Sequence, residues 1–121
     1  MSALGTFTTV VLDCADPGAL ADFYGALTGW KVTYSDDDTV QLGDGGPIQL
    51  GFQRVDGYQP PGWPDPAKQA HLDVGVADLA TGVRKVLALG ATRPDFQPGG
   101  DDWVVLIDPA GHPFCLVLAK D

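Results

Sequence analysis

Basic residues are scarce in this chain of 121 residues. Seven Lys and Arg stand against sixteen Asp and Glu, which gives a net charge of −9. A surface of this charge repels phosphate groups, and the sequence contains no basic stripe that would overrule the total. We therefore expect neither a nucleic acid nor an anionic membrane as a partner.

Long hydrophobic runs are also missing. The longest, Val104–Ile107 and Phe114–Ala119, have the length of strands and fall far short of the roughly 18 apolar residues that span a membrane. The first residues do not show the basic segment, apolar stretch and small-residue cleavage site of a secretory signal. These absences predict a cytoplasmic protein, and the length predicts a single domain.

Cysteine is rare and follows no metal-binding or redox spacing. The two cysteines, Cys14 and Cys115, are far apart in the chain, and neither belongs to a CxxC pattern. Cytosolic chains of this kind keep their thiols reduced. The strand alternation described below places the two side chains on opposite faces of the predicted sheets, so we expect no disulfide.

One pattern of elements occurs twice. Thr9–Asp16 and His71–Asp78 each read as a strand that runs for seven residues to an aspartate, at an offset of 71 − 9 = 62 residues. Each aspartate is a good N-cap for the helical pattern that follows it, and Gly29 and Gly90 are good stop signals. The apolar positions that define the two helical patterns are Leu20, Phe23, Tyr24 and Leu27 in the first copy and Leu79, Val83, Val86 and Leu87 in the second.

Each copy continues with strands separated by Gly- and Pro-rich turns. The order βαβββ, repeated twice, predicts an α+β fold in which two modules form curved mixed sheets around a cleft, with the helices outside. We expect the modules at about residues 6–55 and 69–120, joined by a Pro-rich loop over residues 56–68. Trp63 in this loop is predicted either to pack over a sheet edge or to form part of a pocket rim.

Strand alternation separates the side chains of each strand into two faces. In the strand that follows His71, the residues Leu72, Val74 and Val76 suit a face packed on a helix, which leaves polar residues on the other face. The same alternation applied to the other end strands predicts a cleft lined by Thr9, Gln49, His71, Asp73 and Cys115. Trp103 is a further candidate for the cleft wall, although its strand phase is undecided. Concave sites with a few converging polar groups are the usual ligand sites.

Three stretches resemble the vicinal oxygen chelate superfamily, which contains glyoxalases, bleomycin-resistance proteins and extradiol dioxygenases. These stretches are Asp13–Tyr24, His71–Leu79 and Asp108–Val117, the last of which begins with an Asp-Pro-x-Gly turn. The resemblance is to small, two-module, glyoxalase-like proteins and extends from about residue 6 to residue 119. Many such proteins dimerise, so the resemblance also implies a homodimer.

Metal-dependent members of that superfamily hold one divalent ion with four residues, one each from the first and last strands of both modules. Carried over to this chain, the positions are Thr9, Gln49, His71 and Cys115, of which only His71 is a strong ligand type. The thiolate of Cys115 suits zinc or copper better than the metals of an oxygen-rich site. We therefore expect no resident divalent metal, with His71 as the one weak candidate ligand, and no cofactor can be named.

Three functions follow as alternatives. The first is binding of a small, partly apolar molecule in the cleft between the modules, with ligand contacts from Thr9, Gln49, Asp73, Cys115, Trp103 and Trp63. The second is a metal-assisted lyase, isomerase or dioxygenase. The third is a metal-free acid/base enzyme with His71 as the catalytic residue. Side chains two residues apart on one strand stand about 6–7 Å apart, so we expect no direct hydrogen bond between His71 and Asp73.

Overall fold

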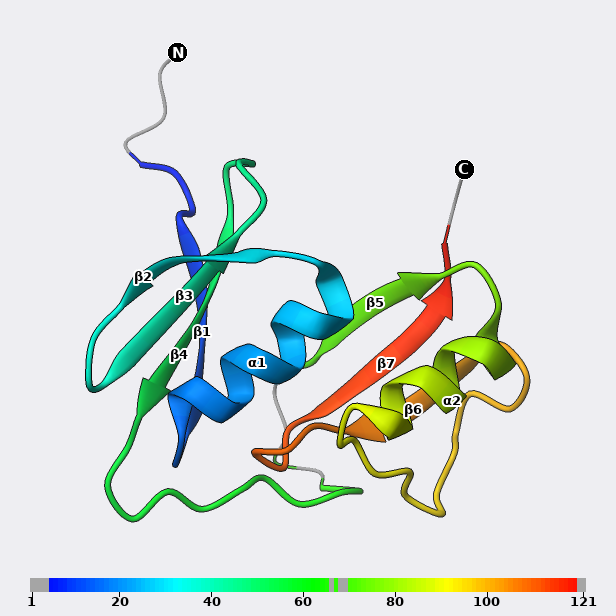
Figure 1. Cartoon of the computed structure of the whole chain (residues 1–121). Coiled ribbons are helices and arrows are strands. Elements are labelled where there is room, and N and C mark those ends of the chain that lie inside the picture. The colour runs from blue at the N-terminus through cyan, green and yellow to red at the C-terminus, as the bar shows by residue number, and fades with distance from the viewer. Residues whose placement is uncertain (1–4, 66, 68–69, 120–121) are drawn as a thin grey trace. The chain divides into compact units, whose positions relative to one another are not determined.

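The computed structural model describes residues 5–65, 67 and 70–119. The chain divides into two compact units, and the division falls between Tyr58 and Gln59. Each unit combines one helix with one sheet (Figure 1). The module boundaries expected at residues 68, 69 and 120 lie outside the described residues.

The first unit contains a four-stranded mixed sheet and one helix. Its elements are β1 (Thr9–Cys14), α1 (Pro17–Thr28), β2 (Lys31–Ser35), β3 (Thr39–Gly43) and β4 (Gln49–Arg54). The strand order is β1-β4-β3-β2. The first and last strands pair in parallel, with Thr9 beside Gln49, and the other pairs are antiparallel.

Local sequence signals explain the limits of α1. The side chain of Asp16 accepts a hydrogen bond from the backbone N–H of Ala19 at 3.1 Å, and Pro17 occupies the first turn. Proline is tolerated there because the first backbone N–H groups of a helix have no partner within it. The helix ends at Gly29, whose φ of 77° lies in the left-handed region that glycine adopts without strain.

The core of the first unit lies between α1 and the sheet. Tyr24 from α1 and Phe52 from β4 are 1% and 0% exposed, and their rings stack with centroids 5.5 Å apart. Strand alternation predicts that Val10 faces the helix, and its register partner, the buried Leu50, lies on that side of the sheet. Val10 is nevertheless 43% exposed, because β1 is an edge strand.

The second unit repeats this plan with fewer strands. Its elements are β5 (Leu72–Val76), α2 (Leu79–Ala88), β6 (Trp103–Ile107) and β7 (Pro113–Leu118). The strand order is β5-β7-β6, with β5 and β7 parallel and β6 and β7 antiparallel. The predicted α+β fold class, with two modules built on mixed sheets, is confirmed.

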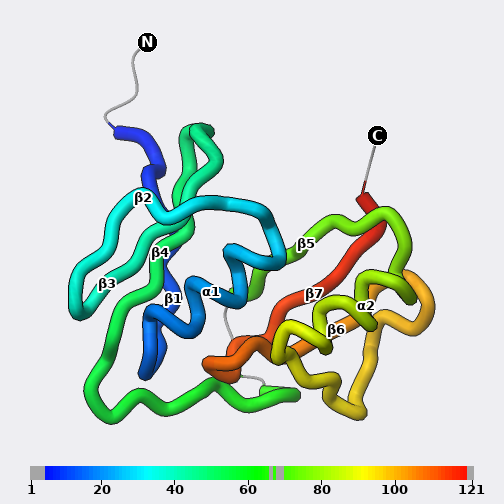
Figure 2. Tube along the Cα trace, viewed as in Figure 1, coloured from blue at the N-terminus to red at the C-terminus, as the bar shows by residue number. Residues whose placement is uncertain are grey.

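The second unit departs from the predicted βαβββ order after α2. Where a second strand was expected, the chain makes one isolated bridge between Thr92 and Ile107. Figure 2 shows the segment between α2 and β6, coloured yellow to orange, as an irregular loop. Pro94 and Pro98 explain the difference, because proline has no N–H to give to a sheet ladder.

The outer edge of β6 is closed by a side chain instead of a strand. The amide of Gln97 donates to the backbone carbonyls of Pro94 and Val105, each at 2.9 Å, and its oxygen accepts from the N–H of Val105 at 2.9 Å. Val105 is 1% exposed, so its polar backbone groups need these partners. The Gln97 side chain therefore satisfies the backbone groups of Val105 that a further strand would otherwise bind.

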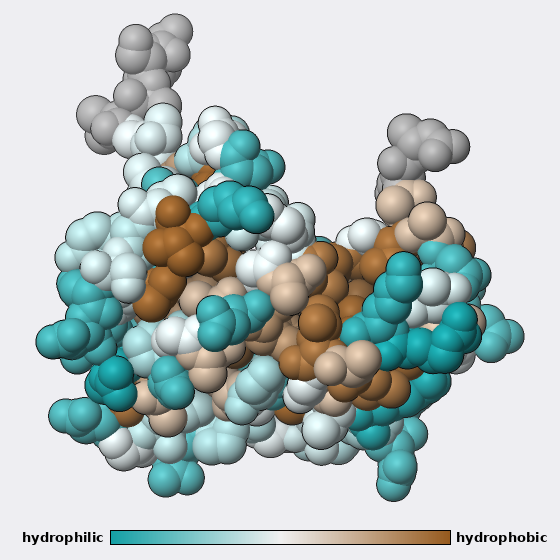
Figure 3. All heavy atoms as spheres, viewed as in Figure 1, coloured by the Kyte–Doolittle hydropathy of each residue, from teal (hydrophilic) through white to brown (hydrophobic). Residues whose placement is uncertain are grey.

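The apolar residues that were predicted to form one face of α2 are buried only in part. Val83 and Val86 are buried, whereas Leu87, which was expected in the same stripe, is 37% exposed. The narrow three-stranded sheet covers the middle of the helix and leaves this residue at its end uncovered. Figure 3 shows the resulting hydrophobic surface around α2, bordered by hydrophilic side chains. In the described part of the chain, no helix is long and apolar enough to cross a membrane.

Asp78 caps α2 and links the stability of this helix to pH. Its side chain accepts a hydrogen bond from the backbone N–H of Thr81 at 2.8 Å. Hydrogen bonds from the Thr81 side chain, and then from its backbone, lower the pKa of Asp78 below its usual value. A lowered pKa means that this stabilisation is complete above the unfolded-state pKa of about 3.9 and is lost as the pH falls through the folded-state value.

We therefore expect Asp78→Ala to lower the free energy of unfolding at pH 7 and to have a smaller effect in strong acid. Asp78→Asn, which keeps a cap acceptor, retains most of the stability at pH 7 and removes this pH dependence. Urea denaturation at several pH values measures both effects, with Asp37→Ala in an exposed loop as the control. A loss from Asp78→Ala that is equal at all pH values would contradict the assignment.

Candidate functional site

His71 and Asp73 form an exposed polar pair in the second unit. The Nε2 atom of His71 lies 3.2 Å from Oδ1 of Asp73, and the side chains are 40% and 57% exposed. The expectation that these side chains stand too far apart for direct contact is wrong. His71 precedes the first residue of β5, so the sheet does not hold its backbone as it holds Asp73, and both side chains have room to turn toward each other.

Cys115 lies beside this pair on the neighbouring strand. Asp73 of β5 and Cys115 of β7 are partners in the parallel register, so their side chains point to the same face of the sheet. One ligand-type atom from each of His71, Asp73 and Cys115 lies within 4.8 Å of the other two. Cys115 is only 8% exposed. We call these three residues the His71 cluster, with the thiol at its floor and the other two groups at its rim.

Trp103 shares the face that carries the His71 cluster. In the antiparallel pairing of β6 and β7, Val105 is opposite Cys115 and Trp103 is opposite Val117. Residues directly opposite each other point to the same side, which decides the phase of Trp103 that the sequence left open. Trp103 is 39% exposed, and it packs against Gly99, where an added Cβ would lie 2.5 Å from the indole. We call this side of the sheet, opposite α2, the open face of the second unit.

Trp63 lies in the second unit and contacts the loop that precedes β6. Its indole N–H donates to the backbone carbonyl of Phe96 at 3.1 Å, and the two ring centroids are 6.1 Å apart. The structure thus gives Trp63 a packing partner in the loop between α2 and β6. Its predicted contact with a ligand stays a prediction.

Thr9 and Gln49 belong to the first unit. They are partners in the parallel register of β1 and β4, and an added Cβ at Gly51 would lie 3.2 Å from the methyl group of Thr9. The side-chain oxygen of Gln49 accepts a hydrogen bond from the hydroxyl of Thr33 at 2.5 Å. The five residues predicted to line one cleft are therefore described as two sets, one in each unit.

The four positions that the superfamily uses for its metal do not form an oxygen-rich site in this chain. Thr9 offers a neutral hydroxyl, and the carbonyl oxygen of Gln49 is already engaged by Thr33. Cys115 supplies sulfur where a carboxylate is expected, and thiolates select other metals than magnesium or manganese. The four-residue set therefore does not fit the metal that the family implies.

Asp73 is the group whose relation to Cys115 the sequence reasoning missed. It was expected in the cleft as a ligand contact, without any link to the thiol. The repeat predicts two end strands in each module, and their parallel pairing places Asp73 directly beside Cys115. The sequence alone does not give the register of that pairing, so the contact could not be predicted.

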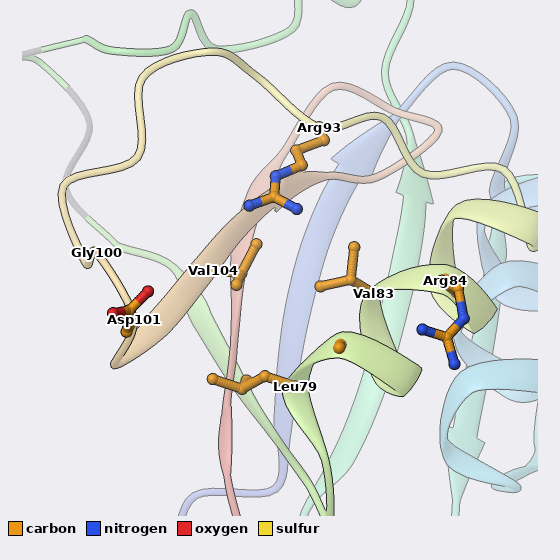
Figure 4. Close-up of a pocket in the computed structure, with 8 residues that line it drawn as sticks. Leu79, Val83, Arg84, Arg93, Gly100, Asp101 and Val104 are labelled. Carbon is orange, nitrogen blue, oxygen red and sulfur yellow. The ribbon is translucent and has the colours of Figure 1, made fainter.

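A separate hollow of about 360 Å³ lies on the other side of the sheet, between α2 and β6. Figure 4 shows Val83 of α2 and Val104 of β6 on its facing sides, with Arg93 and Asp101 at its margin. Val104 alternates with Val105, so this hollow opens on the helix side and not on the open face. It holds no member of the His71 cluster.

Comparison with known proteins decides the family. Residues 9–117 match the model of the glyoxalase-like domain. The chain belongs to the glyoxalase-like family. This places it in the vicinal oxygen chelate superfamily, as the resemblance implied. No curated protein matches this glyoxalase-like chain.

Solved structures of related proteins support the fold of this glyoxalase-like chain. A glyoxalase-related enzyme from Fulvimarina pelagi is 20% identical with a TM-score of 0.70, and the match covers 96% of this chain and 89% of that one. A glyoxalase/bleomycin resistance protein/dioxygenase family enzyme from Burkholderia phytofirmans is 21% identical with a TM-score of 0.68, over 93% and 98% of the two chains. The trypanothione-dependent glyoxalase I of Leishmania major is 20% identical with a TM-score of 0.65, over 94% and 86%. At these identities the likeness concerns the fold.

Proposed function

We propose that this glyoxalase-like protein binds a small, partly apolar molecule on the open face of its second unit, next to His71 and Asp73. The observation that carries the proposal is the 3.2 Å pair itself, which is exposed rather than buried. The carboxylate orients the imidazole, so the pair presents an accessible polar group to an incoming molecule. Trp103 supplies an apolar wall on the same face.

The composition of this face supports a ligand with both polar and apolar parts. A few placed polar groups within an apolar lining are the usual composition of small-molecule sites. Here the polar groups are His71 and Asp73, and the apolar surface comes from Trp103 and Val117. The indole also gives a flat surface on which an aromatic ring can stack.

A screen of ligand-dependent thermal stability tests the proposal. We expect a subset of aromatic antibiotics or small carbonyl compounds to raise the melting temperature, since a ligand at 100 times its Kd adds about 2.7 kcal/mol of stability. His71→Ala should weaken the binding of the same compound by about 10-fold, because a hydrogen bond contributes about 0.5–1.5 kcal/mol. Trp103→Ala should have an effect of similar size, because an aromatic contact contributes about 0.5–1.5 kcal/mol beyond the area that it buries.

His112→Ala is the matched control for this screen, because His112 lies in the turn before β7 and outside the His71 cluster. It should leave the ligand-induced shift unchanged. The proposal fails if no compound in these classes stabilises the protein, or if His71→Ala and Trp103→Ala bind as tightly as the unaltered chain.

A second candidate function is acid/base catalysis by His71 without a metal. The observation in its favour is again Asp73, since a carboxylate beside an imidazole stabilises the charged imidazolium that forms when the ring takes a proton. Any compound that binds is therefore also incubated with the protein and analysed for products. Under this alternative His71→Ala abolishes turnover, whereas under simple binding no product forms with any variant.

The remaining expectations stay predictions. They are that the two modules form a single domain around a shared cleft, that the protein is a cytoplasmic homodimer, and that neither nucleic acid nor membrane is a partner. The single domain rests on the chain length and the cytoplasmic location on the lack of long apolar runs and of a signal pattern. The exclusion of nucleic acid and membrane rests on the charge of −9, and the homodimer and the shared cleft rest on the family.

A further inference from the structure

We propose that His71, Asp73 and Cys115 form a zinc-binding centre contained entirely in the second unit. This centre differs from the four-residue set that the family implies, because it uses Asp73 and needs no residue from the first unit. It also goes beyond the proposed ligand binding, since it concerns a metal ion and does not depend on the identity of any ligand.

The backbone brings the three side chains together. Asp73 and Cys115 are register partners on adjacent strands, and His71 reaches Asp73 from the end of β5 at 3.2 Å. One ligand-type atom from each residue lies within 4.8 Å of the others. Ligand atoms at about 2.0–2.3 Å from a tetrahedral zinc ion stand roughly 3.3–3.8 Å apart, so no pair in the cluster has to close by more than roughly 1–1.5 Å. The pair formed by His71 and Asp73 is already close enough.

Zinc binding requires movement only of the exposed side chains of the cluster. His71 and Asp73 are 40% and 57% exposed, and a small rotation of exposed side chains disturbs no packing. Cys115 is nearly buried on the central strand β7, so its sulfur gives a fixed point around which the other two ligands close. The ion would therefore tighten a site that the fold has already assembled.

The chemistry of the three groups selects the metal. A thiolate and an imidazole favour zinc, whereas magnesium and manganese prefer sites made of oxygen alone. Three protein ligands with the fourth position left open is the usual number for a zinc ion that also contacts an exogenous ligand. The net charge of −9 further favours a cation over an anion at this surface.

Cobalt titration of the full-length protein tests this centre directly. The protein is purified without affinity-column metal, and Co²⁺ is added while the absorption spectrum is recorded. We expect one equivalent of Co²⁺ to produce a sulfur-to-cobalt charge-transfer band in the near ultraviolet, together with the visible bands of tetrahedral cobalt. Zn²⁺ should displace the cobalt at one ion per chain, and Mg²⁺ should not.

The chain contains its own matched controls, because it has two cysteines and two histidines with one of each in the cluster. Cys115→Ser should remove the charge-transfer band, and His71→Gln and Asp73→Asn should each weaken zinc binding by at least about 100-fold, which exceeds the roughly 10–100-fold effect of losing an outer-shell partner. Cys14→Ser and His112→Gln should leave both the band and the affinity unchanged. Circular dichroism checks that each variant is folded.

If Cys115→Ser fails to fold, His71→Gln and Asp73→Asn still test the proposal, because both substitutions are at exposed residues. The proposal is overturned if no stoichiometric Co²⁺ or Zn²⁺ binds, if the band survives Cys115→Ser, or if zinc affinity is unchanged in both His71→Gln and Asp73→Asn. Thermal-shift screening in the presence of a chelator separates this outcome from the proposed function, because ligand binding that persists without metal leaves the first proposal intact.

Discussion

Phe52→Ala is expected to lower the free energy of unfolding by about 3–5 kcal/mol, which is the usual cost of removing a large aromatic ring from a core. Phe52 is 0% exposed and stacks on Tyr24 with an interplanar angle of 12°. The substitution removes apolar contacts and leaves a cavity between α1 and the sheet. Because the residue is on a central strand of the first unit, the neighbouring elements have little freedom to close that cavity.

Urea denaturation followed by circular dichroism measures this effect. Val32→Ala is the control, since Val32 is 59% exposed on the edge strand β2 and surface substitutions usually change stability by less than about 0.5 kcal/mol. Phe52→Leu should fall between the two, because it retains part of the buried volume. A cost for Phe52→Ala below about 1 kcal/mol would show that the first unit is not packed as described.

Gln97→Leu is expected to destabilise the protein by roughly 2–4 kcal/mol, because each buried polar group that loses its partner costs about 1–3 kcal/mol. The substitution leaves both the N–H and the C=O of Val105 without the amide that binds them at 2.9 Å. It also opens the outer edge of β6, and an unprotected edge is a template for pairing with another chain. We therefore expect a lower urea midpoint together with more aggregation, measured by light scattering.

A second substitution at Gln97 tests whether the donor of its amide is needed. Gln97→Glu keeps an acceptor for the N–H of Val105 but removes the donor, and it places a carboxylate near the carbonyls of Pro94 and Val105. It should therefore be no more stable than Gln97→Leu. Gln53→Leu, at an exposed amide on β4, is the control and should have little effect. If Gln97→Leu and Gln97→Glu were as stable as the control Gln53→Leu, a structural role for the Gln97 amide would be excluded.

The architecture followed from features that are local in sequence. A strand that ends in an aspartate, a helical stripe and a glycine stop occur twice, and each of these signals acts within a few residues. The capping roles of Asp16 and Asp78 are confirmed by hydrogen bonds to Ala19 and Thr81. Local chemistry of this kind can be predicted from one sequence because it needs no knowledge of distant partners.

The errors arose where the outcome depends on neighbouring elements. Val10 and Leu87 have the correct periodicity, yet they are exposed because no other element covers them. The missing strand after α2 was a further error, since the strand was expected from the repeat of the first module's order, without regard to the two prolines that prevent a ladder. Periodicity predicts which face a residue points to, whereas burial depends on what lies above that face.

The residues that share the face of the candidate site could be predicted from the sequence, but the contacts between them could not. Strand alternation placed His71, Asp73 and Cys115 on one face, and the pairing of β5 with β7 brings them together. The distance of 3.2 Å between His71 and Asp73 could not be derived from strand spacing. It depends on the side-chain rotation of His71, which precedes β5, and of Asp73, near the start of that strand. The face of Trp103 likewise required the register of β6 against β7.

The parallel pairing of the first and last strands has a consequence for protein engineering. In each unit these strands lie side by side and run in the same direction, so the chain enters a unit at one end of its sheet and leaves it at the other. A strand of six residues such as β4 is about 20 Å long at roughly 3.3 Å per residue. Circular permutation within one unit, or a tandem array made from one unit, therefore needs an added linker of at least about six extended residues.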